Sequence, residues 1–392
     1  MSVDALDELL SPEGWPYASA PPVEPGDPGR FHALFGRDSL ITSLQVLPAR
    51  PDVAAATLRA LAALQGRAED ADTDEEPGKI LHEHRPQAPE QMIADGWPVR
   101  DGELLYYGSA DSTTWFLVVL AELADDRLTA ELEPAWRAAA GWLERTLERG
   151  GGLVRYGPRD RSGGLAQQGW RDAIAPVEAH PGGGGILRPD GSTPRPPQAD
   201  ADVQSAAYAA LRSLCVPSRE EVWERRAEAL AARIERDFGP EIMALEGDDL
   251  AVPGSGSQLG WLLWSGALSE TGREAVAARL CEPDILTPFG LRTLSSASPV
   301  FGPQGYHRGT IWPFDSWLGW SGLRAVGRDA EAERVRSGVL AALDRLGRAP
   351  ELYAVTRASE LEPAPAANRV QAWTVGARWA LEHDWTGRPD WL

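Results

Sequence analysis

Several short strings in the sequence combine carboxylates with arginine, histidine and aromatic residues. Carboxylates can exchange protons, guanidinium and imidazole groups can bond hydroxyl oxygens, and flat rings can cover C–H faces. Together these residue types indicate a pocket for a polyhydroxylated ligand. The strings are Phe35-Gly36-Arg37-Asp38-Ser39, Leu81-His82-Glu83-His84-Arg85, Tyr106-Tyr107-Gly108-Ser109-Ala110-Asp111-Ser112, Gln168-Gly169-Trp170-Arg171-Asp172, Gly290-Leu291-Arg292-Thr293, Tyr306-His307-Arg308-Gly309-Thr310-Ile311-Trp312-Pro313 and Pro350-Glu351-Leu352-Tyr353.

Simpler interpretations of three of these strings stay open. Asp38-Ser39 and Asp111-Ser112 are also typical helix N-caps. His82-Glu83-His84 contains metal-ligand residue types, but the spacing is not the i, i+4 pattern of zinc proteases and no third ligand cluster accompanies it. We therefore expect no metal and no organic cofactor.

Tryptophan is unusually abundant, since its 16 copies exceed the 7 Phe and 7 Tyr together. The pairs Trp261/Trp264 and Trp317/Trp320 have i, i+3 spacing, which favours a place in a helical core over contact with a ligand. Trp170 and Trp312 stand inside the polar strings, so we expect these two rings to form walls of the pocket.

The composition narrows the class of partner. The formal net charge of -20 disfavours nucleic acid, because phosphate binding requires basic surface. No run of about 18 apolar residues predicts a membrane span, and Met1-Ser2-Val3-Asp4 does not read as a signal peptide. Cys215 and Cys281 suit a reduced interior. The sequence predicts a cytoplasmic protein with a small-molecule ligand, and it leaves the oligomeric state open.

Helical periodicity dominates the chain, which predicts an all-α fold. The expected helices are 39–47, 52–66, 112–124, 130–149, 201–215, 219–238, 256–268, 271–281, 311–326, 329–347 and 370–383, with 3–10 as a further candidate.

The links between these helices alternate in length. Short links make antiparallel helical hairpins, so every long link must emerge at the opposite end of the stack. Hairpins in a ring predict an (α/α)6 toroid in which the polar strings meet at one rim. No linker divides residues 1–392, and we expect a single domain. The long links are 67–111, 150–200, 239–255, 282–310 and 348–369.

Taken in order from about Trp15 to Ala380, the strings resemble the catalytic toroid of bacterial amylo-alpha-1,6-glucosidase and glycogen debranching-type glycosidases. They resemble glucoamylases and the glucosylglycerate and mannosylglycerate hydrolases more distantly. Gly36-Arg37-Asp38-Ser39 alone is a weak match, whereas the ordered set of strings, which Gln371-Ala372-Trp373 completes, is highly specific. The N-terminal β domain that many longer relatives carry is not expected here.

The resemblance implies a role for individual residues. Asp172 matches the general acid and Glu351 the general base of an inverting hydrolase. Glu83 is the main rival for either carboxylate role, because it is equally flanked by His and Arg. The substrate-binding residues implied are Arg37, Asp38, His82, Glu83, Tyr107, Asp111, Trp170, Arg171, Asp202, Arg292, His307, Arg308, Trp312 and Trp373.

The chain departs from the relatives in two places. Arg171-Asp172-Ala173 stands where relatives commonly have Lys-Asp-Ser or Met-Asp-Ala, and His307-Arg308-Gly309 stands where they have His-Asn-Gly. We expect an exo-acting, inverting α-glycoside hydrolase, foremost an α-glucosidase acting on small α-glucosides or α-1,6-linked glucose. The alternatives are hydrolysis of a compatible solute such as glucosylglycerate or mannosylglycerate, and a non-catalytic carbohydrate-binding toroid.

Overall fold

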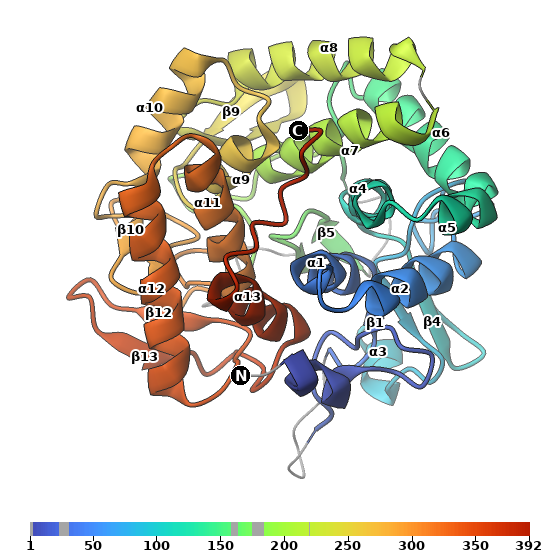
Figure 1. Ribbon diagram of the computed structural model, residues 1–392, viewed down its shortest axis with the longest axis horizontal. Helices are drawn as coiled ribbons and strands as arrows, with labels where there is room; N and C mark the ends of the chain where they lie inside the picture. Colours follow the sequence, from blue (N-terminus) through green and yellow to red (C-terminus); the bar gives the residue numbers. More distant parts are fainter. Residues whose placement is uncertain (1–2, 23–30, 158–163, 175–183, 219) are drawn as a thin grey trace.

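A computed structural model describes residues 3–22, 31–157, 164–174, 184–218 and 220–392. Six helices of the described chain follow one another around a closed ring, because each packs against the next and the last returns to the first. Figure 1 shows them surrounding the centre of the molecule. They are α1 (Gly36–Val46), α4 (Ser112–Leu123), α7 (Ala201–Ser218), α9 (Gln258–Ser265), α11 (Pro313–Ala325) and α13 (Ala372–Glu382).

A second layer of helices covers this inner ring from outside (Figure 1). Each outer element packs on an inner helix that is close to it in sequence, except the 3-10 helix η1 (Val3–Leu9), which packs on α13. The others are α2 (Pro51–Ala63), α6 (Glu133–Arg149), α8 (Glu221–Asp237), α10 (Glu270–Leu280) and α12 (Asp329–Leu346). Two short helices complete the set, α3 (Glu90–Ala94) and α5 (Asp126–Glu131).

The sequence explains which helices lie inside. All residues of α1 and α9 are buried, and these helices carry no acidic or basic side chain beyond the Arg37-Asp38 pair. The outer helix α8 buries only Trp223, Ala227, Leu230 and Ile234, which follow helical spacing along one side, while its other positions are mostly charged.

The prediction of an all-α chain is wrong in one respect, because short antiparallel strands are present. After β1 (Leu34–Phe35), every strand falls within one of the five long links. A four-stranded sheet has the order β1-β2-β4-β3 and a three-stranded sheet the order β7-β8-β9. The bounds are β2 (Glu83–Arg85), β3 (Val99–Arg100), β4 (Glu103–Tyr106), β5 (Leu165–Gln167), β6 (Ala173–Ile174), β7 (Ala199–Asp200), β8 (Ile242–Glu246), β9 (Leu250–Pro253), β10 (Leu286–Thr287), β11 (Gly290–Leu291), β12 (Tyr353–Val355) and β13 (Leu361–Pro363).

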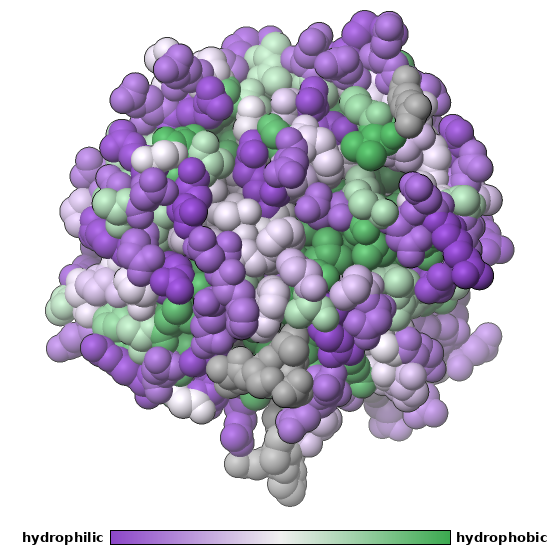
Figure 2. Space-filling model, in the orientation of Figure 1, coloured by the Kyte–Doolittle hydropathy of each residue, from purple (hydrophilic) through white to green (hydrophobic). Residues whose placement is uncertain are grey.

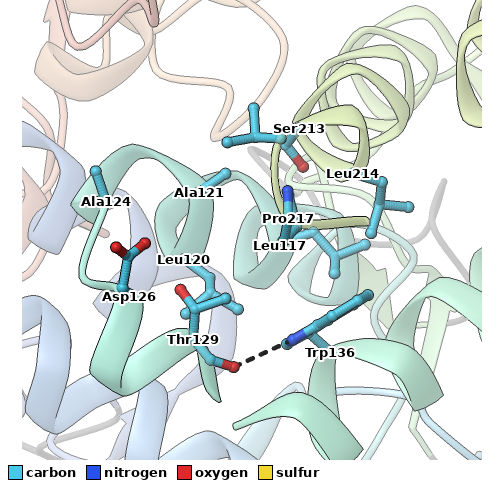
Figure 3. A pocket seen from close by; sticks show the side chains of 11 residues that line it. Leu117, Leu120, Ala121, Ala124, Asp126, Thr129, Trp136, Ser213, Leu214 and Pro217 are labelled. Atoms are coloured by element: carbon cyan, nitrogen blue, oxygen red, sulfur yellow. Dashed lines mark hydrogen bonds between the residues drawn. The ribbon is translucent and has the colours of Figure 1, made fainter. Parts of the chain in front are cut away.

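The surface includes a mostly polar face and a small apolar hollow. The face seen in Figure 2 is mostly hydrophilic with scattered hydrophobic areas. A small apolar hollow of about 130 Å³ lies between α4, α5, α6 and α7, where Trp136 Nε1 donates to the carbonyl of Thr129 at 3.3 Å (Figure 3). None of the predicted site residues lines it, so this hollow is separate from the polar strings.

None of the helices in the described ranges is long and apolar enough to cross a membrane.

Candidate active site

Five of the seven polar strings meet in one cavity of about 580 Å³, and the strings 106–112 and 290–293 contribute no lining residue. Its lining comes from β1, the first turn of α1, four of the five long links and the start of α13. The four are 67–111, 150–200, 282–310 and 348–369, which carry the polar strings, and the link 239–255 contributes no described lining residue. The predicted site residues that line the cavity are Arg37, Asp38, His82, Glu83, Trp170, Asp172, His307, Trp312, Glu351 and Trp373.

The first turn of α1 presents Arg37 and Asp38 to this cavity. β1 pairs with β2, and Gly36 N–H donates to the carbonyl of His82 at 3.0 Å. A Cβ atom on Gly36 would lie 2.2 Å from the carbonyl oxygen of Leu81, so only glycine allows this close approach of strand and helix. Phe35 occupies the N-cap position and Asp38 lies inside the helix. The N-cap interpretation of Asp38 is therefore wrong.

Arg37 is the centre of a buried charge cluster. It donates through Nη1 to Asp111 Oδ1 at 3.0 Å and through Nη2 to Asp172 Oδ2 at 2.8 Å, and its Nε lies 3.9 Å from Asp38 Oδ2. Burial opposes the charged guanidinium, but the three carboxylates outweigh it and raise the pKa of Arg37. Arg37 thus stays charged and fixes Asp172 relative to α1.

Asp111 precedes α4 without capping it. No side-chain oxygen of Asp111 accepts a hydrogen bond from the helix backbone. Its Oδ1 instead accepts from Arg37 and from Ser109 Oγ at 2.9 Å. Asp111 is completely buried, so its role is to hold Arg37 from behind the cavity.

The surroundings of Asp172 make its carboxyl group a weaker acid than that of a free aspartate. Burial raises its pKa to about 6, and the Arg37 guanidinium opposes this shift without cancelling it. Its sequence neighbour Arg171 points elsewhere, because Arg171 Nη2 donates to Ser257 Oγ at 2.8 Å and the guanidinium carbon lies 4.3 Å from the centre of the Trp170 ring. The cation that acts on Asp172 therefore comes from α1.

Trp170 is held in place by Asp202. Trp170 Nε1 donates to Asp202 Oδ2 at 2.9 Å, and the ring lies edge-on to His307 and Trp312 with centroids 5.2 and 5.5 Å apart. Asp202 itself is buried at the start of α7 and lies outside the lining. The structure gives it contact with a cavity wall in place of the expected contact with a sugar.

Glu351 is oriented by three donors. Tyr306 Oη donates to Glu351 Oε1, while the backbone N–H and the side-chain amide of Asn368 donate to Oε2 at 3.1 and 3.3 Å. The residue lies just before β12, and Tyr353 in β12 forms backbone hydrogen bonds with Ile311. These contacts bring Glu351 beside the link that carries Tyr306.

His307 forms a wall with an unused hydrogen-bond donor. Its ring stacks on Trp312 with centroids 5.2 Å apart, and its Nδ1 accepts the backbone N–H of Gly185 at 3.0 Å. Burial lowers the pKa of His307 well below its usual value, so the ring is neutral. An accepting Nδ1 leaves the proton on Nε2, which is buried and has no hydrogen-bond partner among the residues that the structure describes. That N–H is available to a ligand.

Glu83 is a further carboxylate in the same cavity. Arg85 Nε donates to Glu83 Oε1, and burial raises the pKa of Glu83, whereas Arg85 lowers it. His84, between them, points away and lies 2.8 Å from Glu103 Oε1 through Nε2. Within the described ranges, no three His, Cys, Asp or Glu residues are arranged to hold a metal ion.

The remaining predicted binding residues do not line the cavity. Tyr107 Oη donates to the carbonyl of Leu64 at 2.7 Å, and Arg292 donates to the carbonyls of Val355 and Thr356. Arg292 therefore fastens the end of β12. Arg308 is half-buried beside His307. Asp111, Arg171 and Asp202 also lie outside the lining.

Several lining residues were missed in the sequence. Tyr306 directly precedes the predicted His307, and Gln371, whose Nε2 donates to Asp38 Oδ1 at 3.4 Å, stands two residues before Trp373. Their positions inside the quoted strings were the available signal. No sequence signal marked Met92, which lies on α3, or Trp97, which follows it, because α3 spans only Glu90–Ala94.

Comparison with solved structures gives the class of this fold. The GH63 mannosylglycerate hydrolase from Thermus thermophilus matches with a TM-score of 0.66 and 18% identity in its complex with Tris, covering 97% of this chain and 98% of that chain. Its complex with Tris and D-glycerate matches at 0.67 and 18%, with the same coverage. A structure described as a wild-type glycosidase matches at 0.59 and 14% identity, covering 98% and 95%. The helical fold is that of glycoside hydrolases.

The family follows from the sequence match. Residues 38–354 match the model of the mannosylglycerate hydrolase MGH1-like glycoside hydrolase domain, and the chain belongs to that family. No curated protein matches the chain. The expected glycosidase relationship is confirmed, whereas the matching family is the mannosylglycerate hydrolase type and not the debranching type named first.

Proposed function

We propose that this protein hydrolyses a small α-glycoside of the compatible-solute type, such as mannosylglycerate or glucosylglycerate, with inversion at the anomeric carbon. The family match and the similarity to an enzyme crystallised with D-glycerate support this substrate class over the α-glucosidase that we expected first. The closed ring, in which α13 packs on α1, supports an (α/α)6 toroid formed by residues 1–392 as one domain.

Asp172 and Glu351 carry the proposed chemistry. Inversion needs a protonated acid at the glycosidic oxygen and a carboxylate that activates water on the opposite face of the sugar. Asp172 protonates the leaving oxygen, since a pKa of about 6 leaves it protonated in about half of the molecules at pH 6 and about a tenth at pH 7. Glu351, oriented by Tyr306 and Asn368, takes the proton of the attacking water.

The buried side of the cavity binds the sugar ring in this proposal. Asp38 and the Nε2–H of His307 bond its hydroxyl groups, and the rings of Trp312 and Trp373 cover its C–H faces. Arg37 acts through Asp172 and Asp38, which it holds in place.

The observation that carries the proposal is the meeting of Asp172 and Glu351 in one cavity, each with its own set of donors. The proposal requires their carboxyl groups to stand about 6.5–9.5 Å apart, which leaves room for one water.

Anomer-resolved proton NMR of freshly mixed enzyme and α-mannosylglycerate tests it. We expect the β-anomer of the sugar first, and a loss of about 10²–10⁴-fold in kcat with Asp172→Asn. Initial α-anomer would overturn inversion. If the enzyme turns over only α-1,6-linked glucosides, the proposed substrate class is wrong. The protein would then be the α-glucosidase that we expected first.

A further inference from the structure

Arg171 is a buried cation behind the cavity, and the proposed chemistry gives it no part. It directly precedes the general acid Asp172, and its side chain is fully buried. Its Nη2 donates to Ser257 Oγ at 2.8 Å, and its Nε lies 3.5 Å from Asp202 Oδ2. The guanidinium carbon lies 4.3 Å from the centre of the Trp170 ring. Arg171 thus contacts the N-cap residue of α9, the first turn of α7 and a wall of the cavity.

Two acidic residues beside Arg171 each bond the indole of a tryptophan. Trp170 Nε1 donates to Asp202 Oδ2 at 2.9 Å. In the same way, Trp261 Nε1 donates to Asp315 Oδ1 at 2.7 Å. The two indole rings are stacked, with centroids 6.1 Å apart and planes inclined by 4°. Burial raises the pKa values of both carboxyl groups, and the Arg171 guanidinium opposes this shift in each. The Arg171 cluster consists of Arg171, Ser257, Asp202, Trp170, Trp261 and Asp315.

The Arg171 cluster joins the segment of the general acid to the inner ring. Trp170 and Arg171 belong to that segment, whereas the other members of the cluster belong to α7, α9 and α11 or cap them. Helix α9 packs against both α7 and α11, so these partners share one support. The chain is therefore fixed to three helices immediately before Asp172.

Arg171 is not among the groups that shift the pKa of Asp172. Burial raises this pKa, the Arg37 guanidinium opposes the shift, and Asp111 adds to it. The Asp172 carboxyl group points into the cavity toward Arg37 Nη2, while the Arg171 side chain points behind the cavity toward Ser257. An effect of Arg171 on the acid must therefore pass through the backbone that the two residues share.

We propose that Arg171 is a positioning residue for the general acid and acts by fixing the backbone of residues 170–172 through the Arg171 cluster. Arg37 holds the Asp172 carboxyl group from the side of α1, and Arg171 holds the backbone from behind. Proton transfer requires the carboxyl group within hydrogen-bond reach of the glycosidic oxygen, and a misplacement of about 1 Å can cost about 100-fold in rate. The inference rests on the proposed function and adds the group that places its acid.

Arg171→Met removes the guanidinium and keeps an unbranched side chain in its place. On α-mannosylglycerate, we expect kcat to fall about 10–100-fold while KM changes little. On an activated aryl α-mannoside, kcat should stay near that of the wild type, because this leaving group needs no proton. The fall of kcat/KM with rising pH should keep its midpoint near pH 6, since Arg171 does not set the pKa of Asp172. An equal loss on both substrates would overturn the inference, as would a rise in KM with kcat unchanged.

A double variant separates lost position from lost charge. Arg171→Met with Asp202→Asn removes the cation together with the carboxyl group 3.5 Å from it, and the asparagine oxygen can still accept from Trp170 Nε1. We expect this variant to stay as slow as Arg171→Met on α-mannosylglycerate. Recovery of the wild-type rate would mean that Arg171 only balances a buried charge, and the inference would be wrong. Arg171→Lys keeps the charge without the planar fork, and it should show a smaller loss of the same kind if Arg171→Met does not fold.

Hydrogen exchange tests the inference without turnover. Mass spectrometry measures the exchange of backbone amides in peptides that cover residues 165–174, which include β5 and β6. We expect faster exchange there in Arg171→Met than in the wild type. Arg137→Met is the matched control, because Arg137 lies 4.5 Å from the centre of the Trp136 ring but on the outer helix α6, and it should change neither this exchange nor the rates.

The exchange experiment also separates this inference from the proposed function. Unchanged exchange in Arg171→Met would overturn the inference whatever the rates are, and so would an equal change in Arg137→Met. If the wild-type protein cleaves no α-glycoside, or if Asp172→Asn keeps the wild-type kcat, the proposed function is refuted. Faster exchange in Arg171→Met would still show that Arg171 holds the segment that carries Asp172.

Discussion

At the scale of single residues, Asp172 shows how spatial neighbours replace sequence neighbours. Arg171 precedes it in the chain, and the sequence could not tell whether a guanidinium or an apolar ring would dominate its pKa. In the structure Arg171 turns to Ser257 and Trp170, and Arg37 is the cation on Asp172. Burial exceeds the effect of that cation, which leaves the pKa at about 6.

This pKa predicts the pH dependence of activity. A general acid is active only when protonated, so kcat/KM on a glycoside with a poor leaving group should fall as pH rises through about 6. A pH profile of the initial rate measures this fall. An activated aryl glycoside serves as the control, because its leaving group needs no proton and its rate should not fall in this range. A rate that rises through this range on the poor leaving group would contradict the role of Asp172.

The proposed roles of Asp172 and Glu351 predict that their variants respond differently to an activated leaving group. Asp172→Asn should lose about 10²–10⁴-fold in kcat on a poor leaving group and recover most of it on an activated one. Glu351→Gln should stay inactive on both, because the water still lacks its base. Glu83→Gln is the decisive comparison. If it is inactive on both substrates while Glu351→Gln keeps near wild-type rates, Glu83 is the base.

At the scale of elements, the long helices could be predicted, whereas the short helices α3 and α5 and the strands could not. The expected helix 112–124 corresponds to α4 (Ser112–Leu123), and 329–347 to α12 (Asp329–Leu346), because each long helix carries its own periodic pattern. β12 (Tyr353–Val355) is buried at all three residues, so no alternation marks it. The short strands depend on partners in distant parts of the chain.

The candidate site, like the helices, could be predicted only where the signal is local in the sequence. Local strings predicted Asp172, Glu351, His307 and Trp312 as lining residues. They did not predict that Asp202 would bond Trp170, because that contact depends on how α7 packs behind the loop. Residues within the strings could thus be identified, but not which of them face the cavity.

The close packing of two inner helices, α9 and α11, gives a prediction at the scale of elements. A Cβ atom on Gly260 of α9 would lie 2.5 Å from Gly319 Cα of α11. Gly260→Ala must push these helices apart and should lower the free energy of unfolding by about 1–3 kcal/mol, measured by urea denaturation. Gly141→Ala on the outer helix α6, where the nearest atom is the end of the Arg145 side chain, should be neutral or stabilising by up to about 1 kcal/mol. Equal effects would refute the packing argument.

At the scale of the whole molecule, the segment after α13 connects helices from different parts of the ring. Figure 1 shows it running across the ring in front of the inner helices. Trp385 Nε1 donates to the carbonyl of Leu44 in α1 at 2.8 Å, and its own carbonyl accepts from Trp317 Nε1 in α11 at 2.9 Å. Arg388 Nε donates to the carbonyl of Trp264 in α9 at 2.8 Å. One short segment thus bonds three inner helices.

Trp385→Ala should therefore destabilise the whole ring. It removes a large, partly buried side chain and leaves the Leu44 carbonyl with only the 3.4 Å hydrogen bond from Leu47 N–H, so we expect a loss of about 3 kcal/mol in the free energy of unfolding. Trp385→Phe keeps most of the ring contacts and loses only the hydrogen bond, which should cost about 1 kcal/mol. Thermal and urea unfolding measure both. Because the segment contacts none of the cavity lining through these bonds, kcat at a temperature well below Tm should stay unchanged in Trp385→Phe. Wild-type stability in Trp385→Ala would mean that the ring closes without this segment, through the contacts of α13 with α1 alone.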